Sequence, residues 1–99
     1  MKTNILCITP IKHLDGVMEE LIKYGTVTYR PNISKQNLII LLSKKKHNSL
    51  FVNQNKQGYR LDREVLKNSN ISLINTCSTG TNHIDIKYCK KNSIFLQST

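Results

Sequence analysis

The segment from Asn75 to Asp85 combines small polar residues with the start of a helix, and it is the part of the chain best suited to chemistry. Its middle, Ser78 to Thr81, is a turn of small residues after an apolar run, and Asp85 or Asn82 can cap the helix that follows. A strand that passes through a tight turn into a helix aims free backbone N–H groups at one point, which favours a carboxylate or a phosphate. We therefore expect an anion site here. The alternative is a turn that only connects a strand to a helix.

The cysteines and histidines are scattered along the chain and form no recognisable motif. The cysteines contain no CxxC pair, and no Asp, Glu or Cys stands at ligand spacing from a histidine, so we expect no disulfide framework, no metal site and a reducing compartment. Cys77 could act as a thiolate nucleophile beside the small-residue turn. No partner base is near it in sequence, so we interpret it as a small buried hydrophobe.

The acidic residues that precede or open predicted helices are Asp15, Asp62 and Asp85. This position explains them better as caps or first-turn acids than as general bases. We therefore assign no catalytic residue to the chain.

The chain has 99 residues and a formal net charge of +9, which suits one small domain, residues 1–99, with one modest core. Most of the cations are dispersed lysines, and only Lys44 to Lys46 form a run. Neither an aromatic-interleaved stripe nor an Arg-rich element accompanies them, so we expect a solvated face and no nucleic-acid partner.

The N-terminus begins an apolar strand almost at once and lacks the features of a signal peptide. No run approaches the roughly 18 apolar residues that a membrane span needs. We therefore expect a soluble, cytoplasmic protein without a membrane partner.

Short apolar runs alternate with helical patterns. The predicted strands are Ile5 to Thr9, Val27 to Tyr29, Leu50 to Asn53, Ile71 to Thr76 and Ile94 to Leu96. Most are continuously apolar, as in strands that are buried on both faces of a parallel sheet.

Four helices are predicted between these strands. The first has an apolar stripe at helical spacing, formed by Leu14, Val17, Met18, Leu21 and Ile22, and it stops at Gly25. The second begins after Ser34, its expected N-cap, and ends in Lys44 to Lys46, where cations complement the helix dipole. Caps at Asp62 and at Asp85 open the third and fourth.

This order predicts an α/β fold, a flavodoxin-like open parallel sheet with helices on both faces. Such sheets bind ligands at the carboxyl ends of their strands. The segments that follow strands there are Thr9 to Ile11, Asn53 to Asn55 and Ser78 to Gly80.

Four segments in this order resemble one enzyme family. They are TVTYRPNIS at 26–34, YRLDREVL at 59–66, NTCSTGTNHID at 75–85 and YCKKNSI at 88–94. Together they are similar to the N-terminal part of the substrate-binding (catalytic) domain of NAD-dependent D-isomer-specific 2-hydroxyacid dehydrogenases. The resemblance implies a portion of that domain truncated before the Rossmann cofactor domain. In the family, that cofactor domain is followed by a helix that returns to the substrate domain.

The resemblance also implies a site. The family loop whose backbone amides hold the substrate carboxylate matches Ser78, Thr79 and Gly80, and the strand end that faces a small 2-hydroxy or 2-keto acid matches Asn53, with Asn55 beside it. The family's catalytic residues lie in or beyond the cofactor domain, and none carries over to this chain. His83 is not the catalytic base.

The sequence contains no GxGxxG motif, so we expect NAD to be bound by full-length members of the family and not by this chain alone. One departure from the family concerns Ser93, which stands where members often have Gly. We therefore expect Asn92 to supply the left-handed residue at that helix end.

Two functions remain. The first is a dehydrogenase fragment that binds substrate and needs the missing Rossmann cofactor domain, with a homo-oligomer left open. The second is a free-standing flavodoxin-like module that binds a small anion or regulates another protein.

Overall fold

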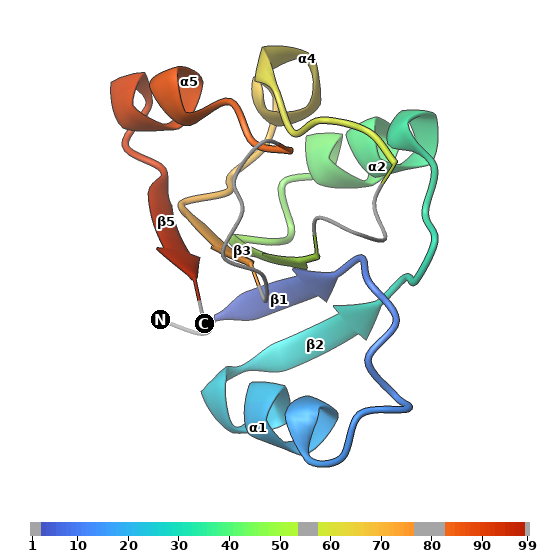
Figure 1. Cartoon of the computed structure of the whole chain (residues 1–99). Helices are drawn as coiled ribbons and strands as arrows, with labels where there is room; N and C mark the ends of the chain where they lie inside the picture. Colours follow the sequence, from blue (N-terminus) through green and yellow to red (C-terminus); the bar gives the residue numbers. More distant parts are fainter. Residues whose placement is uncertain (1–2, 54–57, 77–82, 99) are drawn as a thin grey trace.

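The computed structural model describes residues 3–53, 58–76 and 83–98 of the chain (Figure 1). Its five strands are β1 (Asn4–Cys7), β2 (Thr26–Tyr29), β3 (Ser49–Val52), β4 (Leu73–Thr76) and β5 (Phe95–Ser98). They form one sheet in the order β2-β1-β3-β4-β5, and every neighbouring pair is parallel. This confirms the predicted flavodoxin-like sheet.

The strand register divides the side chains between two faces. Leu6, Leu50, Ile74 and Leu96 occupy paired positions across four strands and lie on one face. Helices α2 (Lys35–Ser43), α4 (Arg63–Leu66) and α5 (Ile86–Lys91) cover this face, and α1 (Val17–Tyr24) lies on the other (Figure 1). The main core is therefore buried between the sheet and three helices.

Three predicted N-caps are confirmed. The Ser34 hydroxyl accepts from the Asn37 N–H at 3.2 Å, and the Asp62 and Asp85 carboxylates accept from the N–H groups of the third residues of α4 and α5 at 3.4 and 3.1 Å. Between the two alternatives for the last helix, the structure selects Asp85. Each cap satisfies a backbone donor that would otherwise have no partner in the first turn.

The predicted first helix was wrong in its start and in part of its apolar stripe. The helix begins at Val17, after Gly16 in a left-handed conformation (φ 81°), so Leu14 lies outside it and is 43% exposed. Ile22 is 59% exposed, because Val17 and Leu21 face the sheet and the residue after Leu21 is turned about 100° away from it. Gly25 ends the helix as predicted, where any Cβ would collide with the Thr3 carbonyl oxygen.

Two other helix ends differ from prediction. The second helix stops at Ser43, so the lysine run follows the helix instead of occupying its last turn, and Lys45 takes a left-handed conformation (φ 57°). At the end of α5 the left-handed residue is Ser93 (φ 59°) and not Asn92 (φ −112°). The Ile94 N–H donates to the Cys89 carbonyl at 2.8 Å, and this closing hydrogen bond places Ser93 at the left-handed position.

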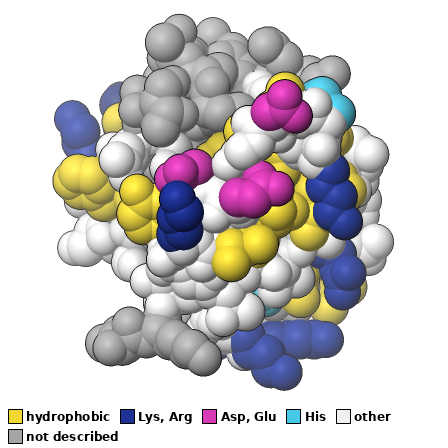
Figure 2. Space-filling model, turned by 90° about the horizontal axis from the view of Figure 1, so that it is seen from below, with side chains coloured by type: hydrophobic (Ala, Val, Ile, Leu, Met, Phe, Trp, Pro, Cys, Tyr) yellow, Lys and Arg dark blue, Asp and Glu magenta, His cyan; other side chains and the backbone are white. Residues whose placement is uncertain are grey.

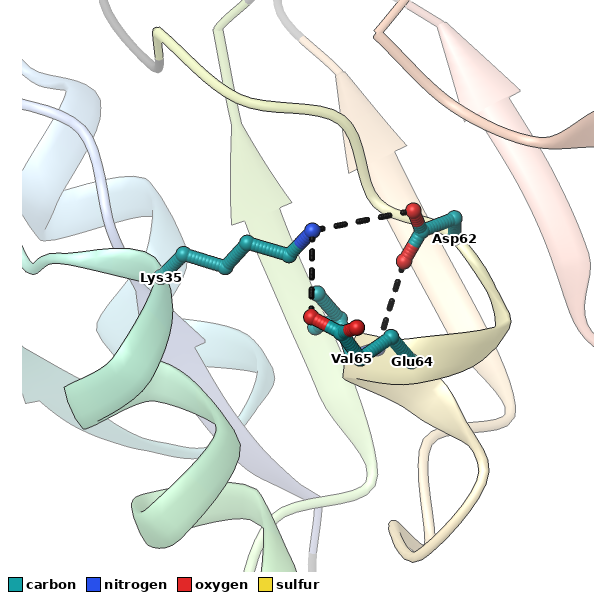
Figure 3. A network of polar contacts seen from close by, with 4 residues as sticks. All are labelled: Lys35, Asp62, Glu64 and Val65. Carbon is teal, nitrogen blue, oxygen red and sulfur yellow. Dashed lines mark hydrogen bonds and ion pairs between the residues drawn. The ribbon is translucent and has the colours of Figure 1, made fainter.

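A polar network joins α2 to the start of α4 (Figure 3). Lys35 Nζ lies 3.3 Å from Glu64 Oε1 and 3.7 Å from Asp62 Oδ2, while Asp62 also caps α4. Lys35 and Asp62 keep about a third of their side-chain surface exposed, and Glu64 keeps 60%. Solvent screens such pairs, so the cap should contribute more stability than the ion pairs.

Replacement of Asp62 by Ala is therefore expected to lower the free energy of unfolding by about 1 to 2 kcal/mol, mainly through the lost cap. The matched variant Glu64→Gln removes an ion pair and keeps the cap, and should cost less than about 0.5 kcal/mol. Urea unfolding of both variants measures the difference. Equal losses would contradict the assignment of the stabilising role to the cap.

Candidate functional site

The carboxyl edge of the sheet holds the predicted ligand segments. Val52 and Thr76 are paired in the register of β3 and β4, so these two adjacent strands end at the same level. Asn53 is half-buried. Ser78, Thr79, Gly80 and Asn55 lie outside the described residues, so the structure brings together the strand ends that carry these segments, without describing the loop itself.

Two further polar side chains near this edge are buried. Thr9 follows β1 and is 1% exposed, and its hydroxyl oxygen has no hydrogen-bond partner among the described residues. His83 is 7% exposed, and neither of its ring nitrogens has such a partner in the described part of the chain. Buried polar groups without partners are uncommon and call for an explanation, and a bound ligand is one.

The backbone holds His83 firmly at this position. Its carbonyl oxygen accepts from the Leu61 N–H at 2.6 Å, and the Leu61 carbonyl accepts from the Asp85 N–H at 2.9 Å, which forms a short parallel bridge. Sequence reasoning placed Thr9 at the functional edge but missed its unpaired hydroxyl, and for His83 it stated that the residue is not the catalytic base. No sequence signal marks either group, because burial and pairing depend on the tertiary structure.

Two titratable groups near this edge, Asp85 and Tyr59, are poor acid–base candidates. The Asp85 carboxylate is occupied as a helix cap. Tyr59 donates its hydroxyl hydrogen to the Ile33 carbonyl at 3.0 Å, and burial raises the pKa of Tyr59 to about 12. Both groups therefore serve the fold.

The two described cysteines, Cys7 and Cys89, are buried. Cys7 Sγ donates to the Thr9 carbonyl oxygen at 3.3 Å. Burial, with a smaller effect of the Asp85 charge, raises the pKa of the Cys89 thiol. The raised pKa keeps the Cys89 thiol protonated, and both cysteines pack as small hydrophobes. Cys77 lies outside the described residues.

The two buried histidines should make stability depend on pH. Burial lowers the pKa of His83 from its ordinary value of 6.5, and burial followed by the charges of Lys46 and Arg30 lowers that of His47. As pH falls through 6.5, the unfolded chain binds protons that the folded chain does not, so stability is lost. Well above that pH, both histidines are neutral in the folded and the unfolded chain, so they do not make the free energy of unfolding depend on pH.

Urea unfolding between about pH 7.5 and about pH 5.5 measures this loss. The His83→Gln variant should show a smaller loss of stability than the parent chain over the same pH range. An unchanged pH dependence in His83→Gln would show that His83 does not titrate as its burial requires.

A groove of about 740 Å³ lies on the α1 side of the sheet. Its walls include Leu21 on α1 and Phe51 and Leu73 on the sheet, and Asp15 and Glu20 border it. Figure 2 shows this face, where hydrophobic and acidic side chains lie together and most basic ones lie along the right-hand margin. Of the described helices, only α1 lies on this face, so the sheet surface under β3, β4 and β5 has no helix of the described chain over it (Figure 1).

None of the described helices has the length and apolar character that crossing a membrane requires.

One family matches nearly the whole chain. The family model described as D-isomer specific 2-hydroxyacid dehydrogenase, catalytic domain, matches residues 5–99. No curated protein matches the chain at a significant level.

Several solved structures share the fold. The PH0520 protein from Pyrococcus horikoshii OT3 aligns with all of this chain and 28% of its own, with a TM-score of 0.85 and 23% identity. A glyoxylate reductase from Paecilomyes thermophila aligns over 99% of this chain and 32% of its own, with a TM-score of 0.82 and 18% identity. A D-lactate dehydrogenase from Aquifex aeolicus, complexed with NAD and lactic acid, aligns over 97% and 28%, with a TM-score of 0.71 and 24% identity. The chain thus spans about a third or less of the length of these proteins.

Proposed function

The chain belongs to the family of D-isomer specific 2-hydroxyacid dehydrogenases, and we propose that it is the N-terminal part of the substrate-binding domain of such an enzyme. The enzyme would oxidise a D-2-hydroxy acid or reduce a 2-keto acid with NAD, and a separate cofactor domain would complete it. The observation that carries the proposal is the family match over residues 5–99, on a sheet of the expected strand order.

The residues of this chain do not fit a dinucleotide. The connection from β1 to α1, residues 8–16, holds a proline and the single glycine Gly16, and the connection from β2 to α2, residues 30–34, holds no glycine. A pyrophosphate requires a glycine-rich turn between a strand and a helix. The proposal therefore assigns NAD to a cofactor domain, and this chain only binds and orients the acid.

Substrate binding is assigned to Ser78, Thr79 and Gly80, with Asn53 beside them. The backbone N–H groups of such a loop can hold both oxygens of a carboxylate, and the Asn53 side chain can donate or accept a further hydrogen bond. Two observations support the assignment. The strands β3 and β4, which precede the two segments in the sequence, are adjacent and end in register, and buried polar groups without partners among the described residues, on Thr9 and His83, lie close to the same edge.

The uncovered groove supports the requirement for a second part of the enzyme. Its apolar walls and acidic border suit a helix that carries an apolar stripe flanked by cations. In the family, a helix returns from beyond the cofactor domain to the substrate domain, and this face can receive it.

A titration of the isolated chain with pyruvate or glyoxylate, monitored through the amide signals in NMR spectra, tests the proposed site. We expect saturable shifts of the Thr79 and Gly80 amide signals with a millimolar dissociation constant. This corresponds to a favourable binding free energy of about 4 kcal/mol. The amides of Lys44 to Lys46 should move no more than with chloride at equal ionic strength. Shifts confined to the lysine run, with Thr79 and Gly80 unmoved, would contradict the assignment.

Two variants make the titration more specific. Asn53→Ala should weaken binding about threefold to tenfold, as the loss of one hydrogen bond to a charged ligand does. Asn37→Ala on the exposed surface of α2 removes the same side chain elsewhere and should leave the affinity unchanged.

The second candidate is a free-standing module that binds a small anion or regulates another protein. The net charge of +9 favours it, because a positive field attracts anions without any enzyme chemistry. The two candidates differ in whether a cofactor domain belongs to the same protein.

A further inference from the structure

A second concavity, of about 550 Å³, lies toward the amino ends of the strands. It is lined by Asn4, Thr28, Lys45, Lys46 and His47. Asn4 begins β1 and His47 lies two residues before β3, whereas the substrate segments follow the carboxyl ends of β3 and β4. This amino-end pocket is therefore separate from the proposed substrate site.

Hydrogen bonds fix the segment that carries the lysines. The His47 Nε2 atom lies 3.0 Å from the Thr28 hydroxyl oxygen, which ties the ring to β2. Asn48 is joined to Asn4 twice, by its side-chain oxygen at 3.0 Å and by its backbone N–H at 3.1 Å. The pocket is thus built on the sheet and not on a free loop.

Lys45 stands in a backbone conformation that glycine adopts without strain. Its φ is 57°, at the position after the helix end where Gly is the usual residue. The Asn70 side chain donates to its carbonyl oxygen at 3.0 Å and helps to hold it there. Because a lysine occupies a backbone conformation that favours glycine, the hypothesis follows that its charge contributes to ligand binding.

The electrostatic surroundings are positive. None of the six acidic side chains, all of which lie in the described residues, lines this pocket. His47 is 8% exposed and its Nδ1 atom has no hydrogen-bond partner among the described residues. Burial, then Lys46, then Arg30 lower the pKa of His47, so both cations act on the ring. A bound anion would offset this repulsion and favour the protonated ring.

We propose that the amino-end pocket binds a dianionic phosphate group, either inorganic phosphate or the phosphate of a small monoester. Lys45 and Lys46 supply charge, and the Thr28 hydroxyl and the Asn4 side chain supply hydrogen bonds. The described residues that line the pocket include no Phe, Tyr or Trp on which a base could stack, so the pocket suits a phosphate group better than a nucleotide base. The competing explanation is a solvated lysine run with no ligand.

The test is an NMR titration of the whole chain with inorganic phosphate, with chloride at equal ionic strength as the reference. We expect saturable shifts of the Lys45, Lys46 and His47 amides and a higher pKa of the His47 ring when phosphate is bound. A parallel titration with methyl phosphate distinguishes the two sources. Equal affinity means that the pocket recognises the dianion alone, and tighter binding means that it also recognises the ester group.

Two variants separate a specific site from net charge. K45G removes one cation and relieves the left-handed conformation, so it should weaken phosphate binding about fivefold while the chain stays at least as stable. The control K90Q/K91Q removes two cations at the end of α5, at the opposite end of the sheet, and should leave phosphate binding within about twofold. Amide shifts that grow linearly with phosphate concentration, as they do with chloride, would overturn the proposal. A loss of phosphate affinity in K90Q/K91Q as large as that in K45G would also overturn it.

Discussion

The isolated chain is expected to leave reduced nicotinamide cofactor unconsumed when it is mixed with 2-keto acids such as pyruvate and glyoxylate. It has no glycine-rich turn for a pyrophosphate, and near the carboxyl edge Asp85 serves as a helix cap and the Tyr59 hydroxyl donates to a backbone carbonyl. Hydride transfer needs the cofactor beside the substrate and a positioned proton donor. Without a bound cofactor and a positioned proton donor, the rate of hydride transfer should be lower by many orders of magnitude and equal to that in buffer.

Absorbance of the reduced cofactor over time measures this result. A complete D-lactate dehydrogenase, such as the Aquifex aeolicus enzyme, serves as the positive control at equal molarity. Cofactor consumption above the buffer rate that persists after repurification would contradict the proposal that this chain only binds and orients the substrate.

Self-association through the face beside α1 is the second large expected effect. An apolar helix stripe that buried roughly 300 to 400 Å² there would contribute on the order of 8 kcal/mol at about 25 cal/mol per Å², an upper bound comparable to the stability of a small domain. Without such cover, apolar surface faces water. The isolated chain should therefore associate with itself or melt at low temperature.

Two charge-introducing variants identify the face involved. Phe95 is 68% exposed and lies on the groove side, in register with Leu73, so Phe95→Lys should reduce association. Ile40 is 58% exposed on α2, on the opposite side of the sheet, so Ile40→Lys should not. Sedimentation velocity compares them. A monodisperse parent monomer that melts sharply well above about 60 °C would show that the face needs no cover.

Local sequence signals predicted the elements of this fold well. Ser34, Asp62 and Asp85 were identified as caps because a cap depends on residues within one turn of the helix. The first helix was less well predicted, because the apolar spacing of Leu14 and Ile22 resembles a buried stripe although both lie outside the core. Hydrophobic periodicity does not distinguish a buried face from apolar residues at its margin.

Site features that depend on distant contacts were not predictable from the sequence. Asn4, Thr28 and His47 form one pocket only because β1, β2 and the segment before β3 are neighbours in the sheet. The unpaired groups of Thr9 and His83 are likewise consequences of burial by other elements. The substrate loop was identified from its family resemblance and its place after a strand, and Ser78, Thr79 and Gly80 remain a prediction.

The most direct test of the central claim, that this chain is the substrate-binding part of a dehydrogenase, is to sequence its transcript beyond the codon for Thr99. The proposed function predicts an open reading frame that continues into a strand followed by GxGxxG and a helix, the signature of a dinucleotide-binding domain. A stop codon directly after Thr99 in an intact transcript would contradict it and would favour the free-standing anion-binding module.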